Sequence, residues 1–376
     1  MATGFVWHER YMWHNTGRGT GPFQSDASGW FEPATTHRES VDTKRRFRNL
    51  LEVTGLLGQL VPIDPRPATD EELCRFHTRE HVDRIRAESA QWGGDGGDGA
   101  TPFGRGSFEV AALAAGGVIA AVDAVLDGVA DNAFALVRPP GHHALADTGM
   151  GFCIFGNPAI ATMHARETRG LDRVAIVDWD VHHGNGTQSA FFTDPSVLTI
   201  SVHQDNNFPP GSGLLEEVGD GAGAGANLNL PLPPGSGTGA YESAFERVVI
   251  PALERFSPDL IIVASGLDAS ALDPMARMMM TPEGYASLTR MVMDAAERLC
   301  GGRLVIEHEG GYSEEFVPFC GLAVVEALSG VETDCRATPL HEVARGLGGQ
   351  DLQPHQEESI ARAEELVAAV PGPQPG

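Results

Sequence analysis

Residues 173–187 read RVAIVDWDVHHGNGT, an apolar run followed at once by two acids and two adjacent histidines. In extended backbone, residues two apart point to the same side, so Asp178, Asp180 and His182 share one direction. Asp180 and His182 can then both reach one ion. The stretch predicts a buried strand that ends in a metal-binding and proton-transfer site.

Short apolar runs alternate with longer helical patterns along much of the chain. From Asn132 onward the runs are NAFALV, RVAIVDW, VLTISV, NLNL, DLIIVAS and RLVIEHE. The helical patterns, each with an apolar stripe, include SFEVAALAAGGVIAAVDAVLDG, GAYESAFERVVIPALERF and PEGYASLTRMVMDAAERLC. This alternation is typical of an α/β fold with a parallel sheet.

Residues able to do chemistry follow the ends of these runs. His142 and His143 come after the first run, His203 after the third, and Asp268 and Tyr312 after two more. In open α/β sheets, ligands bind outside the carboxyl ends of the strands. We therefore expect these sequence-distant segments to converge on one crevice.

Asp180, His182 and Asp268 form a candidate metal-binding set. An Asp-x-His pair alone is more often a turn cap or a hydrogen-bonded histidine, but Asp268 at a second strand end favours a metal. Two carboxylates, one imidazole and an open position for water match the plan of catalytic zinc. Such zinc lowers the pKa of bound water to about 7 and polarises a carbonyl group.

His142 and His143 follow a proline-containing turn in RPPGHHALADTGMGFC. Histidine is the natural base for hydrolysis because its pKa lies nearest neutral pH. Asp178 and Asn185 are candidate partners that orient the two rings. A ring facing a carboxylate is held more positive than one facing an amide, so the two histidines should differ in role. A purely structural hydrogen-bonding pair is the alternative.

Tyr312 stands after two glycines in EHEGGYSEEF, where the backbone can approach the crevice closely. A phenol there can donate a hydrogen bond to a developing oxyanion, opposite the metal. The alternative is a tyrosine that only packs within a loop.

These motifs together resemble the histone deacetylase superfamily of zinc amidohydrolases. The match runs from about Thr43 to Gly330, and its motifs read RPPGHHA, GFCIFGN, DWDVHHGNGTQ, SGLDAS, DPMARMMMTPEGY and EGGYS. Asn185 in place of an aspartate makes the chain similar to the class II branch and to bacterial histone deacetylase-like amidohydrolases. The resemblance implies an arginase/deacetylase fold, an open parallel sheet of about eight strands with flanking helices and long active-site loops. It also implies hydrolysis of an N-acetyl amide to an amine and acetate.

The resemblance further implies a role for each matching catalytic residue. One zinc ion would be held by the three candidate ligands named above. His143 would act as general base and then as general acid, with His142 as its electrostatic partner. Tyr312 would polarise the substrate carbonyl together with zinc.

Other matching residues are implied to bind substrate. Phe152 and Phe208 would flank an acyl-lysine tunnel, and the carbonyl group of Gly151 would accept the substrate amide N–H. Asp98 is a candidate contact to the substrate backbone at the rim. Met275 stands where a polyamine-specialised relative carries an acidic gatekeeper, which favours acyl-lysine-like substrates.

A structural monovalent cation, usually potassium, lies behind the zinc site in this family. Its ligands, partly main-chain oxygens, would come from Asp178, Asp180, His182, Ser201 and Val202.

Composition limits the remaining classes of function. A formal charge of −25 disfavours binding to nucleic acid or anionic membranes, both of which need a basic face. The N-terminal residues mix charged and aromatic side chains without a continuous apolar core, and no later stretch looks long and apolar enough to span a bilayer, so we expect a cytoplasmic protein. The cysteines show no paired spacing and should be reduced and mostly buried; they are Cys74, Cys153, Cys300, Cys320 and Cys335.

We expect a single deacetylase domain over residues 1–370 and a disordered tail over 371–376. Residues 1–50 and the glycine-rich WGGDGGDGATPFGRG look irregular and could form loops over the crevice. The long N-terminal extension suggests a homo-oligomer, a dimer or tetramer.

Three alternatives remain open for the function. The substrate could be an acetylpolyamine or another acetylated small amine rather than an acetylated lysine of a peptide or protein. A binuclear, arginase-type manganese hydrolase is less favoured, because Ser270 stands where a second acid would help to bridge two ions. A non-catalytic acyl-lysine-binding module is disfavoured because every catalytic position holds a competent residue.

Overall fold

The computed structural model describes residues 1–20, 23–24, 35–335 and 338–373. Its core is one sheet of eight parallel strands in the order β11-β10-β9-β12-β13-β8-β1-β5. The strands are β1 (Thr3–Val6), β5 (Val61–Ile63), β8 (Asn132–Ala135), β9 (Val174–Asp178), β10 (Val197–Gln204), β11 (Asn227–Leu232), β12 (Leu260–Ser265) and β13 (Leu304–His308). The expected open parallel sheet of about eight strands is confirmed.

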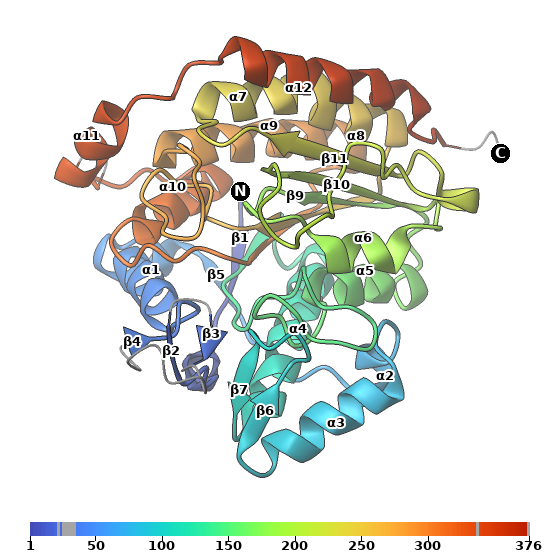
Figure 1. The fold of residues 1–376 in the computed structure, drawn as a ribbon, viewed down its shortest axis with the longest axis vertical. Coiled ribbons are helices and arrows are strands. Elements are labelled where there is room, and N and C mark those ends of the chain that lie inside the picture. Colours follow the sequence, from blue (N-terminus) through green and yellow to red (C-terminus); the bar gives the residue numbers. More distant parts are fainter. Residues whose placement is uncertain (21–22, 25–34, 336–337, 374–376) are drawn as a thin grey trace.

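Helices cover both faces of this sheet (Figure 1). One hydrophobic cluster lies under α1 (Asp42–Val53), α7 (Thr238–Ala244), α8 (Ile250–Phe256), α9 (Pro282–Cys300), α10 (Val317–Ser329) and α12 (Pro354–Glu364). The other lies under α3 (Arg79–Ser89), α4 (Ser107–Leu126), α5 (Asn157–Glu167) and α6 (Asn185–Phe191). In β9, Ala175 and Val177 join the first cluster while Val174 and Ile176 join the second. The apolar run of β9 is therefore buried on both faces.

The position of β9 in the sheet decides where the site lies. β10 and β11 extend the sheet on one side of β9, whereas β12 pairs with β9 on the other side. The chain order reverses at this point, because β9 is followed by β10 on one side and β12 is followed by β13 on the other. Such a switch point is the usual ligand-binding crevice of an open α/β sheet.

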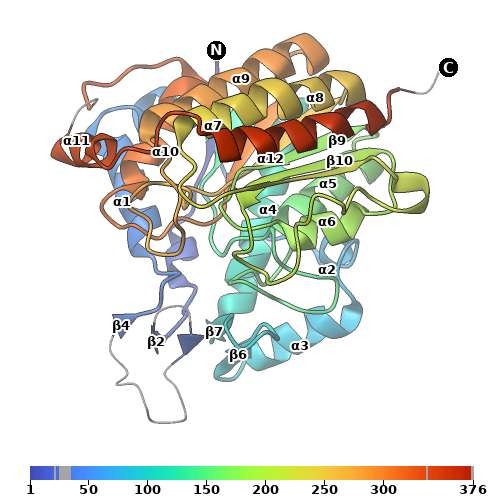
Figure 2. The ribbon, with the colours of Figure 1, turned by 45° about the horizontal axis from the view of Figure 1, so that its top comes forward.

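The expectation that residues 1–50 are irregular is wrong for several segments. β1 is an inner strand between β8 and β5, and α1 begins within the same stretch. β1 has only four residues, which is too short for a periodic pattern to identify. A small antiparallel sheet of β2 (Arg18–Thr20), β3 (Phe23–Gln24) and β4 (Thr35–Thr36) lies nearby, visible in Figure 2.

The glycine-rich stretch also contains strands, since β6 (Gly93–Asp95) and β7 (Pro102–Gly104) form an antiparallel hairpin. Asp95 at the hairpin end accepts hydrogen bonds from the backbone N–H groups of Gly97, Gly99 and Thr101. This carboxylate gives a defined shape to a loop that its composition alone suggested to be irregular.

α4 is the one described helix that is long and apolar enough to cross a membrane, with a mean hydropathy of 1.9. The expectation that no stretch reaches this length and hydropathy is therefore wrong. The helix contacts α5, β8 and β1, and most of its side chains are buried in the second cluster. Its hydropathy is that of a core helix packed inside the protein.

One predicted helix is divided in the structure, and the cysteines are unpaired as expected. The pattern GAYESAFERVVIPALERF is helical but divides into α7, a π-helical turn over Phe245–Val249, and α8. The five cysteines are unpaired, and three of them are buried. Of the expected disordered tail, residues 374–376 lie outside the described residues.

A buried charge cluster ties the N-terminal segment to the sheet. The Arg138 guanidinium contacts both carboxylate oxygens of Glu39 at 2.8 Å, and Lys44 Nζ lies 3.1 Å from Glu39 Oε1. All three side chains are at most 1% exposed. Arg138 also donates to the carbonyl groups of Tyr11 and His14. One buried carboxylate thus compensates two buried cations.

We expect Glu39→Gln to lower the free energy of unfolding by about 3–5 kcal/mol, because it leaves two cations buried without a counter-charge. The matched control is Glu254→Gln, which removes half of the surface pair with Arg298, whose side chains are about half exposed. That change should cost no more than about 1 kcal/mol. Urea denaturation measures both; equal effects would contradict the role given to Glu39.

Candidate active site

The segment after β9 turns away from the sheet while it keeps the alternation of its side chains. β9 ends at Asp178, so the expectation of extended strand as far as His182 is wrong. Asp180 donates its backbone N–H to Asp178 Oδ1, and His182 donates its N–H to Asp180 Oδ1. Trp179 and Val181 are completely buried in the core. Their burial directs the acids and the histidine into the crevice.

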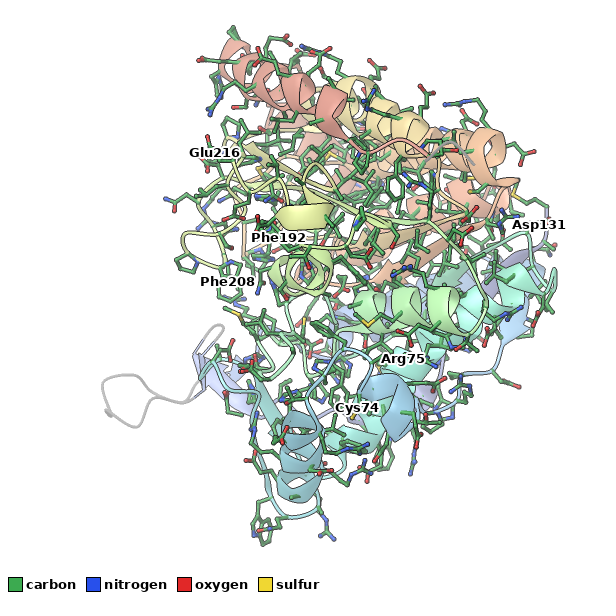
Figure 3. All side chains as sticks on the ribbon, turned by 90° about the vertical axis from the view of Figure 1, so that its right-hand side faces the viewer. Cys74, Arg75, Asp131, Phe192, Phe208 and Glu216 are labelled. Atoms are coloured by element: carbon green, nitrogen blue, oxygen red, sulfur yellow. The ribbon has the colours of Figure 1, made fainter. Side chains whose placement is uncertain are left out.

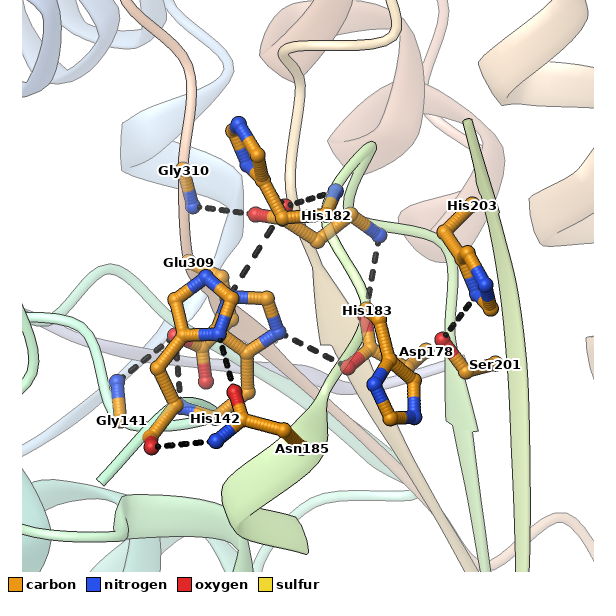
Figure 4. Close-up of polar contacts among 12 residues, drawn as sticks. Gly141, His142, Asp178, His182, His183, Asn185, Ser201, His203, Glu309 and Gly310 are labelled. Atoms are coloured by element: carbon orange, nitrogen blue, oxygen red, sulfur yellow. Dashed lines mark hydrogen bonds and ion pairs between the residues drawn. The ribbon is translucent and has the colours of Figure 1, made fainter. Parts of the chain in front are cut away.

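The three predicted metal ligands meet there. Nδ1 of His182 lies 2.9 Å from Asp180 Oδ1 and 3.2 Å from Asp268 Oδ2. Asp268 comes from the loop after β12, and its other oxygen accepts the N–H of Val181. Asp180 Oδ2 accepts the N–H of Gly310, a contact drawn in Figure 4. All three ligand candidates are buried.

Glycine is required where the backbone passes these carboxylates. A Cβ at Gly310 would lie 2.1 Å from Asp268 Oδ2, and one at Gly266 would lie 2.2 Å from Asp180 Oδ2. Both distances are shorter than any van der Waals contact. The two glycines therefore let three loops approach one point.

This donor set fits a divalent cation. Asp268 Oδ2 receives no well-aligned hydrogen bond from the described residues, although it is buried. Burial alone would lower the pKa of His182, but the adjacent carboxylates of Asp180 and Asp268 raise it to about 10. Two buried carboxylates that face one ring nitrogen thus require positive charge. One imidazole nitrogen and two carboxylates with an open side are a typical zinc donor set.

The adjacent histidines have different partners. His142 Nδ1 lies 2.9 Å from Asp178 Oδ2, whereas His143 Nδ1 lies 2.7 Å from Asn185 Oδ1. Burial favours neutral rings, but the charges of Asp180 and Asp178 raise the pKa of His142 well above its usual range. Burial, followed by repulsion from His142 and His182, lowers the pKa of His143. The difference has the direction expected from a carboxylate and an amide partner.

Glu309 holds the turn that carries both histidines, a role that sequence reasoning missed. Its Oε2 accepts the backbone N–H groups of Gly141 at 2.7 Å and of His142 at 3.2 Å, as Figure 4 shows. The available signal was an acid directly before the glycine pair of EHEGGY. It gave no indication of a partner some 168 residues away in the chain.

Tyr312 lies across the crevice from the histidines. Its ring centroid is 6.4 Å from that of His182 and 5.8 Å from that of Phe152. Its backbone N–H donates to Asp273 Oδ2 at 2.7 Å, and Lys44 Nζ lies 5.7 Å from the ring centroid. Burial, followed by the charge of Asp268, raises the pKa of Tyr312 well above its usual range. The phenol therefore keeps its proton at neutral pH.

The substrate residues implied by the resemblance lie beside these groups. A Cβ at Gly151 would lie 2.3 Å from the His143 ring and 2.9 Å from the Phe208 ring, so the position requires glycine. Phe208 is half-buried, and Figure 3 shows it near the surface of the molecule. Asp98 Oδ2 accepts the N–H of Gly151 at 2.8 Å, which places these two candidate substrate residues side by side. Phe152 is buried, with a positive φ of 72°.

Two further predicted groups can be located. Met275 is half-buried, and its N–H donates to Asp273 Oδ1 at 2.8 Å. Ser201, one of the expected potassium ligands, pairs with Asp178 across β10 and β9. Its neighbour Val202 is buried in the core.

His203 does not belong to the crevice. It lies inside β10 instead of after it, with Nδ1 bonded to Ser201 Oγ and Nε2 bonded to the carbonyl group of Gly213. Its ring packs against His183, and burial lowers its pKa to about 3. The sequence placed it near a strand end, but β10 continues one residue beyond it.

A second buried group, His142, Cys153 and Glu309, is also close enough to hold a metal. Its geometry is less suitable. Nδ1 of His142 is engaged by Asp178, and Nε2 lies 3.8 Å from Asp180 Oδ1, toward the first group. Burial raises the pKa of the Cys153 thiol, which disfavours the thiolate form that binds metals.

Comparisons with known proteins agree with this arrangement. The histone deacetylase domain model matches residues 37–328. A histone deacetylase-like amidohydrolase from Pseudomonas aeruginosa is 49% identical over 89% of this chain and 88% of its own length. A probable deacetylase from Archaeoglobus fulgidus is 37% identical over 90% of this chain and 89% of its own.

A solved structure supports the same assignment. The crystal structure of the HDA15 HD domain matches with a TM-score of 0.82 and 34% identity, covering 98% of this chain and 96% of that one. The parallel sheet and helical layers described above are thus shared with a deacetylase fold. With its sequence, its fold and its crevice in agreement, the chain belongs to the histone deacetylase family and is a hydrolase of the amidohydrolase type.

Proposed function

We propose that this protein is a zinc-dependent deacylase that hydrolyses N-acetyl, or other N-acyl, groups on lysine-like amines. The proposal rests mainly on the convergence of Asp180, His182 and Asp268 on one point. This set stands beside two differently charged histidines and one protonated phenol. Zinc dependence is a general property of the family, and the donor set here fits it.

One Zn²⁺ held by these ligands would supply Lewis acidity, which activates water and polarises the amide carbonyl. His143 is the base. Its Nδ1 donates to Asn185 Oδ1 and its pKa is low, so Nε2 is free to accept a proton from water. The same proton then passes from Nε2 to the departing amine, which leaves as a free amine beside the carboxylic acid.

His142 and Tyr312 stabilise charge during this step. His142 stays protonated between Asp178 and Asp180 and contributes positive charge beside the reacting group. Tyr312 donates its phenolic hydrogen to the oxygen of the substrate carbonyl as negative charge develops there. The raised pKa keeps that hydrogen in place at neutral pH.

The walls of the crevice favour a slender, apolar chain. The Phe208 ring lies 5.0 Å from that of His143, and Phe152 packs against Tyr312. An aliphatic lysine stem beside these rings would make apolar contacts and would need no charged partner. Met275 adds an apolar side chain at the position of the gatekeeper, which favours acyl-lysine over acetylpolyamine substrates.

A potassium ion is the second part of the proposal. Asp178 and Ser201 would contribute side-chain oxygens, and main-chain oxygens would come from Asp180, His182 and Val202. The pairing of Ser201 with Asp178 across neighbouring strands supports this placement. The ion would stiffen the segment that carries the zinc ligands.

The purified protein should contain about one zinc per chain by elemental analysis. Asp268→Ala should lose the metal and all measurable activity, whereas the exposed Asp205→Asn should retain both. Chelation should abolish turnover of an acetyl-lysine peptide, and added zinc should restore it. Two equivalents of manganese together with ureohydrolase activity would instead favour an arginase-type enzyme.

Removal of either the base His143 or the phenolic hydroxyl of Tyr312 should greatly reduce turnover with little loss of stability. We expect Tyr312→Phe to lower kcat by about 10²–10³-fold and His143→Ala by about 10²–10⁴-fold on a fluorogenic acetyl-lysine peptide. Tyr285→Phe is the matched control, since it removes a buried hydroxyl with no partner among the described residues. Wild-type rates in the first two variants would refute the assigned roles.

Substrate class is tested by comparing acetyl-lysine peptides, acetylpolyamines and longer acyl-lysines at saturating zinc. Acetyl- or acyl-lysine peptides should have the highest kcat/KM. Met275→Glu should raise the relative kcat/KM for acetylpolyamines, because a carboxylate there would attract their remaining ammonium groups. A wild-type preference for acetylpolyamines would support the alternative substrate class.

A further inference from the structure

The loop between β12 and α9 carries a residue that holds the catalytic tyrosine. Asp273 is 8% exposed, and its Oδ2 accepts the backbone N–H groups of Tyr312 at 2.7 Å and Ser313 at 3.2 Å. Its Oδ1 accepts the N–H of Met275. One buried carboxylate thus fixes the backbone of Tyr312 relative to the gatekeeper side chain. We call residues 269–280 the tyrosine-holding loop.

Neighbouring segments anchor the returning half of this loop. Arg277 donates its N–H to Gln204 Oε1 at 2.7 Å, and Met279 donates its N–H to the carbonyl group of Ser236 at 2.9 Å. Met280 pairs with Ser270, which closes the base of the loop. The position of Met279 therefore influences where Asp273 lies.

Gln350 reaches this loop from the far end of the chain. Its Nε2 donates to the carbonyl group of Met279 at 2.7 Å, and its Oε1 accepts the hydroxyl of Thr238 at 3.0 Å. The Gln350 carbonyl group accepts the N–H of Gly239 at 2.8 Å. One side chain therefore joins the tyrosine-holding loop to the start of α7.

The backbone around Gln350 is closely packed against the same elements. A Cβ at Gly237 would lie 2.2 Å from the carbonyl oxygen of Gly349, and one at Gly349 would lie 3.0 Å from Met279. Figure 2 shows the link between α11 (Pro339–Gly346) and α12 passing beside α7. This link lies beyond residues 37–328, where the family model matches.

We propose that Gln350 is a positioning residue of the active site, which acts through Met279 and Asp273 on Tyr312. The inference rests on the proposed deacylase function, and it assigns a task in catalysis to the C-terminal segment. Without the amide donor, the Met279 carbonyl group loses the Gln350 side chain as a partner and keeps only its backbone bridge to Gly237, so the returning half of the loop can shift. A displacement of about 1 Å at a catalytic group is enough to reduce turnover severely.

The test uses Gln350→Glu, which keeps the length of the side chain and an acceptor but replaces the donor with a carboxylate. Gln350→Ala is the second variant, and Asp351→Asn in the same link is the matched control. For an acetyl-lysine peptide, both Gln350 variants should lower kcat by roughly tenfold with KM nearly unchanged. The control should keep wild-type values, and the melting temperatures and zinc contents of all variants should remain close to wild type.

A double-mutant cycle tests the route through Asp273. If Gln350 acts through this residue, the kcat loss of Gln350→Ala should be largely absent in an Asp273→Asn background. Full additivity of the two losses would overturn the proposed route. Wild-type kcat in both Gln350 variants would overturn the inference itself.

Hydrogen exchange provides a readout that does not depend on turnover. The amides of Tyr312, Ser313 and Met275 should exchange faster in Gln350→Glu than in wild type, and should not change in Asp351→Asn. If the wild-type protein hydrolyses no acyl-amine but exchange increases as expected, the proposed function fails and the positioning contact stands. Unchanged exchange, with an active wild-type enzyme, would refute the positioning contact alone.

Discussion

The site depends on two buried carboxylates that face one imidazole nitrogen. Asp180 and Asp268 can meet at His182 because β9 and β12 are neighbours in the sheet and Gly266 and Gly310 leave room for both acids. Such a concentration of negative charge inside a protein is stable only with positive charge beside it. The requirement for a cation is therefore a consequence of the strand order, and the chemistry proposed here follows from that cation.

The second feature of the site is its asymmetry. His142 and His143 are adjacent in the chain and equally buried, yet their pKa values move in opposite directions. The difference comes from one acid and one amide, Asp178 and Asn185, at otherwise equivalent places. The carboxylate partner keeps His142 positively charged, whereas the amide partner leaves His143 neutral and able to accept a proton. Hydrolysis at neutral pH needs both states at once.

Three acidic residues hold the backbone of the site residues in place through hydrogen bonds. Glu309 binds the backbone of the histidine turn, Asp273 that of Tyr312, and Asp98 that of Gly151. Each uses a carboxyl oxygen to accept hydrogen bonds from backbone N–H groups, which fixes the position of that backbone. Gln350 extends this support to the C-terminal link. The turn that carries the two candidate catalytic histidines is thus held by a residue more than a hundred positions away in the chain.

The sequence alone predicted the fold class. It also predicted the metal-binding candidates Asp180, His182 and Asp268, which the structure groups together. The apolar run of β9 predicted a buried strand, and the metal candidates followed strand ends, where parallel sheets place ligands. Short strands such as β1, and the partners Glu309, Asp273 and Gln350, were not visible there, because four residues carry no clear period and hydrogen bonds across the chain leave no local pattern. Only the tertiary structure decided which strands are neighbours. That order, set by packing of the helices on both faces of the sheet, brings Asp268 to His182.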